Sequence, residues 1–296
     1  MRTEQKTPGR KMLCILRYIC LVIFAVMCIY PLIWLFLAAF KTNEELYVNA
    51  WGLPQTWNIE NFRSAVVDYQ IFRYFLNSIL VSFATVAITL VLAAMVSFAI
   101  TRLRWKLSKL TYNLFTVGMM IPVYAMIIPL FYIFKKINLL NSYWSVIIAQ
   151  TAIQMPLAVF ILTGFMRDIP YELEEAAIID GCSMFGVFWR IILPISRPSL
   201  VTVAVVNFIN VWNELLLPRI FLTETTKMTL PVGLSYFSSM HATNYVAEIA
   251  AIIITIIPTI LMYVLLHKNI MAEWWPVRSK DDVCTIKWKT ERKDQK

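Results

Sequence analysis

Six predominantly apolar stretches, each long enough to cross a lipid bilayer, constrain this chain more than any other feature of its sequence. They cover approximately residues 13–40, 75–101, 110–134, 143–166, 200–217 and 245–267. A helix needs about 20 apolar residues to cross a hydrocarbon core of roughly 30 Å. The strands of a membrane barrel alternate polar and apolar residues, and runs such as Ile252, Ile253 and Ile254 do not alternate. The sequence therefore predicts an all-α, polytopic membrane protein with six transmembrane helices.

Composition and charge agree with a membrane protein and argue against several other classes. Only 15% of the residues are charged and 59% are hydrophobic, whereas in soluble domains about a quarter of the residues are charged. The net charge of +9 comes from basic residues between apolar runs, which favours the lipid bilayer as a partner and not nucleic acid. The chain has five cysteines and two histidines, but no CxxC pair and no spacing typical of a metal site. We therefore expect no metal ion and no other cofactor.

The distribution of Lys and Arg predicts the orientation. Because these residues are retained in short cytoplasmic segments, an N-terminus inside the cell puts 20 of the 27 basic residues on the cytoplasmic side and seven outside. Residues 1–12 and the basic tail 268–296 are then both cytoplasmic, and 13–267 form the transmembrane domain. The first apolar stretch is too long for a signal peptide, whose apolar region spans about 7 to 15 residues, so we interpret it as a retained anchor.

The segment between the fourth and fifth stretches carries signals for a short cytoplasmic helix. Asp168 and Pro170 are typical of a helix start, and the acidic Glu174 and Glu175 suit the positive end of a helix. Gly181 can end the helix in a left-handed turn. These signals predict a helix of about three turns.

One face of this helix and the segment after it are apolar although both are predicted to lie in the cytoplasm. Ala176, Ala177 and Asp180 share a face at helical spacing, and two adjacent alanines allow another backbone to approach closely. Phe185 belongs to the apolar run 184–189. Exposed apolar surface of this kind indicates a protein partner.

These residues also carry a family resemblance. Glu175-Ala176-Ala177, then Gly181, then Ile191-x-Leu193-Pro194 resembles the EAA loop of ATP-binding-cassette (ABC) importer permeases in residues and in spacing. The resemblance implies that residues 167–199 form a coupling loop that sits in a cleft of a separate ATPase subunit. The residues it assigns to this coupling are Glu174, Glu175, Ala176, Ala177, Asp180, Gly181, Phe185, Leu193 and Pro194.

Further stretches are similar to the maltodextrin-type carbohydrate permeases, and within them to the six-span subunit. They are Asn77-Ser78, Met120-Ile121-Pro122, Ile128-Pro129-Leu130, Trp212-Asn213-Glu214 and Thr229-Leu230-Pro231-Val232-Gly233-Leu234. The resemblance implies import of a sugar or oligosaccharide through a bacterial or archaeal cell membrane. It also implies a second related permease, two copies of an ATP-hydrolysing subunit and an extracellular substrate-binding protein. The tail departs from the pattern, because no glycine follows Gly233.

Other functions fit the sequence less well. The chain holds no Gly-x-x-x-x-Gly-Lys-Ser/Thr loop, so we expect a transport subunit without its own ATPase site. The acidic cluster of the loop has no matched histidine or metal ligand for acid–base chemistry. An integral-membrane enzyme is therefore a remote alternative. The same machinery with a polyamine, phosphate or amino acid as cargo is the nearer alternative, although an anionic cargo would call for Lys or Arg at membrane depth.

Polar residues inside the spans are candidates for the substrate path. Gln150 and Gln154 are one turn apart, and Asn207, Asn210 and Glu214 fall on one helical face. Polar groups at membrane depth face a cavity or another helix. Two readings remain open: hydrogen bonds to the hydroxyl groups of a sugar, or hydrogen bonds that hold the helices together.

The orientation is testable by cysteine labelling in intact cells. A cysteine near Asn58 should react with a membrane-impermeant reagent from outside, and one near Ser183 only after permeabilisation, because of the asymmetry of basic residues. The opposite labelling pattern would overturn the orientation and the cytoplasmic placement of the loop.

Overall fold

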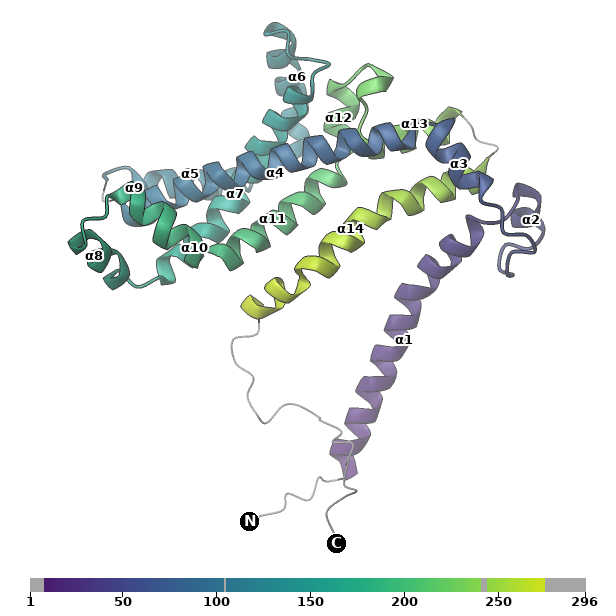
Figure 1. The fold of residues 1–296 in the computed structure, drawn as a ribbon, viewed down its shortest axis with the longest axis horizontal. Coiled ribbons are helices and arrows are strands. Elements are labelled where there is room, and N and C mark those ends of the chain that lie inside the picture. Colours follow the sequence, from purple (N-terminus) through teal and green to yellow (C-terminus); the bar gives the residue numbers. More distant parts are fainter. Residues whose placement is uncertain (1–7, 104, 241–243, 275–296) are drawn as a thin grey trace.

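The computed structural model describes residues 8–103, 105–240 and 244–274, and the regular secondary structure in these ranges is helical throughout. Figure 1 shows a bundle of long helices, with α1 leaning away from it. The bundle contains α4 (Ile71–Arg102), α7 (Tyr143–Asp168), α11 (Arg197–Trp212) and α14 (Tyr245–Trp274). The all-α prediction is confirmed.

Short helices mark the two ends of the bundle (Figure 1). One end carries α8 (Glu172–Ile179) and α9 (Met184–Val187), and is called the loop end below. The opposite end carries α2 (Asn43–Val48), α3 (Glu60–Val67) and α13 (Leu230–Met240). The bundle therefore holds its connecting segments at two separate faces.

Within the described ranges, three helices are long and apolar enough to cross a membrane without a break. They are Ile15–Ala38 within α1 (Pro8–Ala38), α4 and α7, with 24, 32 and 26 residues. They agree with the predicted spans 13–40, 75–101 and 143–166 within a few residues. The start of α7 is fixed by Ser142, whose side-chain oxygen accepts a hydrogen bond from the backbone N–H of Trp144 at 3.3 Å.

The predicted span 110–134 is not one continuous helix. It consists of α5 (Ser108–Gly118), the 3₁₀ turn η1 (Val123–Met126) and α6 (Ile127–Lys136), with a bend of 98°. Pro122 lies at the break. Proline has no backbone N–H and disfavours a helical conformation in the residue before it, so the helix ends ahead of it.

The predicted span 200–217 is also interrupted. The segment Met184–Ile195 contains α9, the π-helical turn η2 (Phe188–Ile192) and α10 (Leu193–Ile195), and meets α11 at 73°. Helix α11 ends at Trp212, and a separate helix α12 (Leu216–Phe221) follows, with the 3₁₀ turn η3 (Thr225–Lys227) beyond it. The predicted span was therefore too long at its C-terminal end.

The predicted boundaries at the chain ends are tested only in part by the described residues. Helix α14 begins at Tyr245, as predicted, and continues through the expected boundary at residue 267. Within α14, the apolar helical segment is Tyr245–Leu261. Residues 1–7 and 275–296, which include most of the predicted basic tail, lie outside the described residues.

The contact between α4 and α7 forms the centre of the bundle. Ala93 and Ala94 of α4 and Ala158 of α7 are buried in one apolar cluster. Small side chains allow two helices to approach closely in a membrane, where dispersion contacts and interhelical hydrogen bonds stabilise packing. The Ser97 hydroxyl lies 3.3 Å from the Val159 carbonyl oxygen and donates to it across this contact.

Asn77 and Ser78 tie a loop to the opposite end of α4. The Asn77 amide donates to the carbonyl oxygens of Thr226 and Met228 at 3.0 and 2.9 Å, and accepts from the Tyr143 hydroxyl at 2.8 Å. The Ser78 hydroxyl accepts from the backbone N–H of Leu230 at 2.7 Å. The Asn77-Ser78 motif thus joins α4, α7 and the loop before α13.

Replacing Asn77 should loosen this junction. Leucine at position 77 removes three hydrogen bonds and leaves two carbonyl groups unpaired, so we expect a loss of about 1–3 kcal/mol in the free energy of unfolding. Thermal unfolding in detergent measures this change. Asn213→Leu is the control, because among the described residues the Asn213 amide, directly after α11, donates to one group, the carbonyl oxygen of Ile209 in the last turn of that helix. An equal effect of both substitutions would contradict the assigned role.

Candidate functional site

The predicted coupling helix is α8, and it is shorter than expected. It begins at Glu172, because Ile169 adopts an extended conformation after α7, and it has eight residues, about two turns. Gly181 has a φ of +82°, so the predicted left-handed turn is confirmed. The N–H groups of Gly181 and Cys182 bond to the carbonyl oxygens of Ile178 and Ala177 and close the helix end.

Most of α8 is exposed. Glu174 is its one buried residue, whereas Ile178 and Ile179 expose 49% and 85% of their surface. Glu175 and Ala176 are exposed, and Asp180, directly after the helix, is exposed too. Exposed carboxylates and large exposed aliphatic side chains therefore lie side by side on this short helix.

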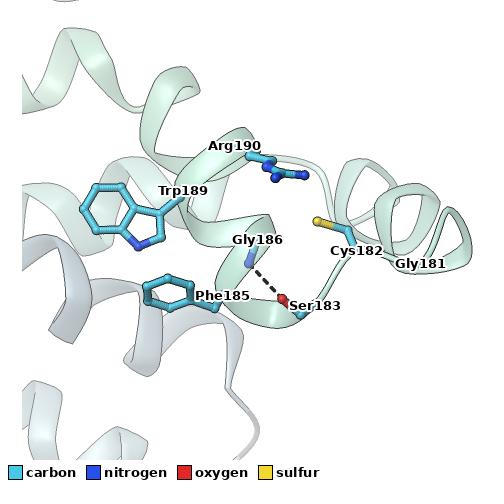
Figure 2. Close-up of a pocket in the computed structure, with 7 residues that line it drawn as sticks. All are labelled: Gly181, Cys182, Ser183, Phe185, Gly186, Trp189 and Arg190. Carbon is cyan, nitrogen blue, oxygen red and sulfur yellow. Dashed lines mark hydrogen bonds between the residues drawn. The ribbon is translucent and has the colours of Figure 1, made fainter.

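Helix α9 adds an aromatic pair to the same end. Ser183 begins this helix, since its hydroxyl accepts from the Gly186 N–H at 3.2 Å. Phe185 and Trp189 are exposed, and their ring centroids are 6.0 Å apart at an angle of 64°. Figure 2 shows the two rings beside each other, with Arg190 and Cys182 on the other side of the α9 turn. A cavity of about 480 Å³ is lined by Gly181, Cys182, Ser183, Phe185, Gly186, Trp189 and Arg190.

Glu174 faces the interior of its own chain. Its carboxylate oxygen Oε1 lies 2.7 Å from Nε of Arg102, at the end of α4, and both side chains are buried. The two atoms are close without the alignment of a hydrogen bond, so the contact is one between charges. Burial raises the pKa of the Glu174 carboxyl, the Arg102 charge opposes the rise, and nearby Glu175 adds to it.

The remaining predicted coupling residues lie where the loop joins the bundle. Ala177 and Leu193 are partly buried against the apolar cluster around α4 and α7. Pro194 is exposed and follows the π-helical turn η2. The structure therefore brings the predicted residues to one end of the bundle, some at its surface and some at its base.

Sequence reasoning missed Arg102 as part of this site. It was counted only among the basic residues that predict the orientation. The sequence did hold a signal for this contact. Arg102 ends an apolar span, and an acidic helix is predicted on the same, cytoplasmic side. The helical phase that turns Glu174 and not Glu175 inward depends on where α8 begins, and the pattern alone did not fix that position.

The predicted substrate-path residues are separated by the structure into three environments. Gln154 and Asn210 meet across α7 and α11, with a donated hydrogen bond of 3.3 Å from the Asn210 amide, and Asn210 is exposed. Gln150 and Asn207 are buried, and both polar atoms of the Asn207 side chain have no partner among the described residues. Glu214 accepts from the N–H groups at the start of α12, at 2.9 and 3.2 Å.

Comparison with known families identifies the chain. The family model described as the binding-protein-dependent transport system inner membrane component matches residues 89–271. The chain belongs to this family. The matched region contains the whole loop from α7 to α11, and the prediction of an ABC importer permease, an integral inner-membrane protein, is confirmed.

Individual relatives agree with the family. The chain is 32% identical over 252 residues to a diacetylchitobiose uptake system permease protein of Streptomyces coelicolor, covering 84% of this chain and 83% of the relative. It is 30% identical over 251 residues to a probable starch degradation products transport system permease protein of Thermoanaerobacterium thermosulfurigenes, covering 85% and 91%. A chain in a crystal structure of a bacterial ABC transporter for alginate import has the same fold, with a TM-score of 0.77, 21% identity and coverage of 90% and 99%.

Proposed function

We propose that this permease forms half of the translocation pore of a sugar or oligosaccharide importer, and couples to a separate ATP-hydrolysing subunit through α8 and α9. The observation that carries the proposal is the exposed acidic and apolar surface of α8 and α9 at one end of the bundle, formed by the EAA motif. The exposed Ile178, Ile179 and Phe185 suit an apolar cleft. Glu175 and Asp180 suit basic groups at its rim.

The proposal assigns each end of the bundle to a side of the membrane. The loop end and both termini are cytoplasmic, in agreement with the distribution of Lys and Arg. Two copies of the ATP-hydrolysing subunit bind at the loop ends of this chain and of a second related permease. An extracellular binding protein delivers substrate at the opposite end. ATP hydrolysis is assigned to the other subunit, since this sequence has no phosphate-binding loop.

The cargo is proposed to be an uncharged sugar. The two relatives described above are named for uptake of diacetylchitobiose and of starch degradation products. No charged side chain occurs in residues 74–101, 110–134, 143–166 and 198–213, so the polar groups of these four segments are neutral amides and hydroxyls. A neutral amide both donates and accepts hydrogen bonds, which suits the hydroxyl groups of a sugar. A phosphate would call for Arg or Lys at this depth.

Among the candidate path residues, Asn210 is assigned to the pore and Asn207 to helix packing. Asn210 is exposed on this chain and bonds to Gln154, so its amide remains reachable for a solute. Asn207 and Gln150 are buried inside the chain, and we assign them to contacts between helices. Glu214 caps α12 and holds the outer end of α11.

Loss of the turn at Gly181 should weaken binding of the ATP-hydrolysing subunit. Alanine at position 181 must adopt φ of +82°, which costs roughly 1–2 kcal/mol, and we expect about a 5- to 30-fold weaker co-purification of that subunit. Gly164→Ala is the matched control: a Cβ there also meets nothing within 4 Å, and Gly164 lies inside α7. Equal binding by the two variants would contradict the proposal that α8 binds the ATP-hydrolysing subunit.

Leucine at Asn210 and at Asn207 should have different effects on transport. Asn210→Leu should reduce sugar uptake about two- to tenfold and change the preference between two sugars, because one hydrogen bond to the substrate is lost. Asn207→Leu should lower the thermal stability in detergent and leave the preference between the two sugars unchanged. Uptake kinetics for two sugars and thermal unfolding separate the roles. An unchanged preference in Asn210→Leu would refute its place in the pore.

A further inference from the structure

Helix α8 has few fixed contacts with the bundle. It is joined to α7 by the extended Ile169 and by Pro170, and to α9 through the left-handed Gly181. Of its eight residues only Glu174 is buried. A force applied to α8 could therefore be absorbed by movement at these connections, unless a side chain fixes the helix to its neighbours.

Arg102 supplies such a contact, because it joins α4 to both α7 and α8. Its Nη2 donates to the carbonyl oxygens of Met166 and Ile169 at 2.6 and 2.8 Å, at the end of α7. Its Nε lies 2.7 Å from Oε1 of Glu174 in α8. Its guanidinium carbon lies 4.4 Å from the ring centre of Tyr171. Arg102 itself is the last residue of α4.

Tyr171 completes the contact from the side of α8. Its hydroxyl donates to the carbonyl oxygen of Thr101 at 3.2 Å, so the residue before α8 is bonded to the last turn of α4. The carbonyl groups at a helix end have no partner within their own helix. Arg102 and Tyr171 therefore satisfy the ends of α7 and α4 while they hold the start of α8.

Burial makes this contact resist separation. Among the ion pairs in the described part of the chain, Arg102–Glu174 is the one shielded from water, whereas the side chains of Glu60–Arg63 and Glu224–Lys227 are 35–72% exposed. If α8 moved away, the Arg102 guanidinium, held to the carbonyl groups of Met166 and Ile169, would stay buried without the Glu174 charge beside it, and an uncompensated buried charge is costly. A displacement that keeps α8 against α4 and α7 is therefore favoured over one that pulls α8 away.

We propose that Arg102 is a positioning residue that makes α8 move together with α4 and α7, so that a displacement of α8 reaches the whole bundle. The proposal rests on the proposed function, since the displacement comes from the ATP-hydrolysing subunit. Arg102 need not contact that subunit or the sugar. Its contribution is to pass movement from the loop end to the helices that line the pore.

The first test measures the contact in the chain alone. Spin labels at positions 179 and 103, both exposed in this structure, report the distance between α8 and the end of α4 in a chain whose native cysteines are replaced by serine. Glu174→Ala should broaden the distance distribution. Glu172→Ala removes the same charge from the exposed face of the same helix and should leave it narrow. Equal distributions in the two variants would overturn the proposal.

The second test measures coupling in the complete transporter reconstituted in vesicles. In Glu174→Ala we expect ATP hydrolysis to persist while sugar uptake per ATP falls about tenfold. The double variant Arg102→Met with Glu174→Ala should lose no more than Arg102→Met alone, because that substitution already removes the Arg102–Glu174 contact together with the bonds to Met166 and Ile169. An unchanged ratio in Glu174→Ala, or independent losses in the double variant, would overturn the proposal. A wild-type complex without sugar uptake would instead refute the proposed function, and the spin-label result would still decide the role of Arg102.

Discussion

The packing of α4 against α7 is the contact on which the rest of this structure depends. Lipid removes the hydrophobic effect between helices, so close contact of small side chains and interhelical hydrogen bonds must hold them together. Alanines provide the close approach in the middle of the pair. Side chains of α4 bond to α7 at three levels, through Asn77 to Tyr143, Ser97 to Val159 and Arg102 to Met166. The two helices run in the same direction and share both ends of the bundle.

Other elements are attached to this pair. At the opposite end, Asn77 and Ser78 hold the loop before α13, and Gly233 lets α13 approach the Tyr74 ring so closely that a Cβ at this position would overlap the ring. At the loop end, Arg102 holds the start of α8. One helix therefore contacts both the proposed ATPase-binding segment and the loop at the far face. This arrangement suits a protein that must move as a unit between two orientations.

The sequence predicted the parts of the fold that follow from local chemistry. Apolar runs located the long helices, and Gly181 in the EAA spacing predicted the left-handed turn. The breaks were harder to predict, because Pro31, Pro156 and Pro258 lie inside continuous helices whereas Pro122 lies at a bend of 98°. Tertiary contacts decide which proline interrupts a helix, since neighbouring helices can compensate the missing hydrogen bond. The contact between Arg102 and Glu174 joins residues far apart in sequence, so no local pattern predicted it.

The central claim is that α8 is the surface through which this permease meets its ATP-hydrolysing subunit. The most direct measurement is photo-cross-linking in the complete transporter, from an amino acid with a photoreactive side chain placed at position 179 or at position 132. Ile179 is 85% exposed on α8, and Tyr132 is 67% exposed on α6, away from the loop end. We predict a cross-link to the ATP-hydrolysing subunit from position 179 and none from position 132. No cross-link from position 179 in an assembled, transporting complex, or equal cross-linking from both positions, would contradict the account.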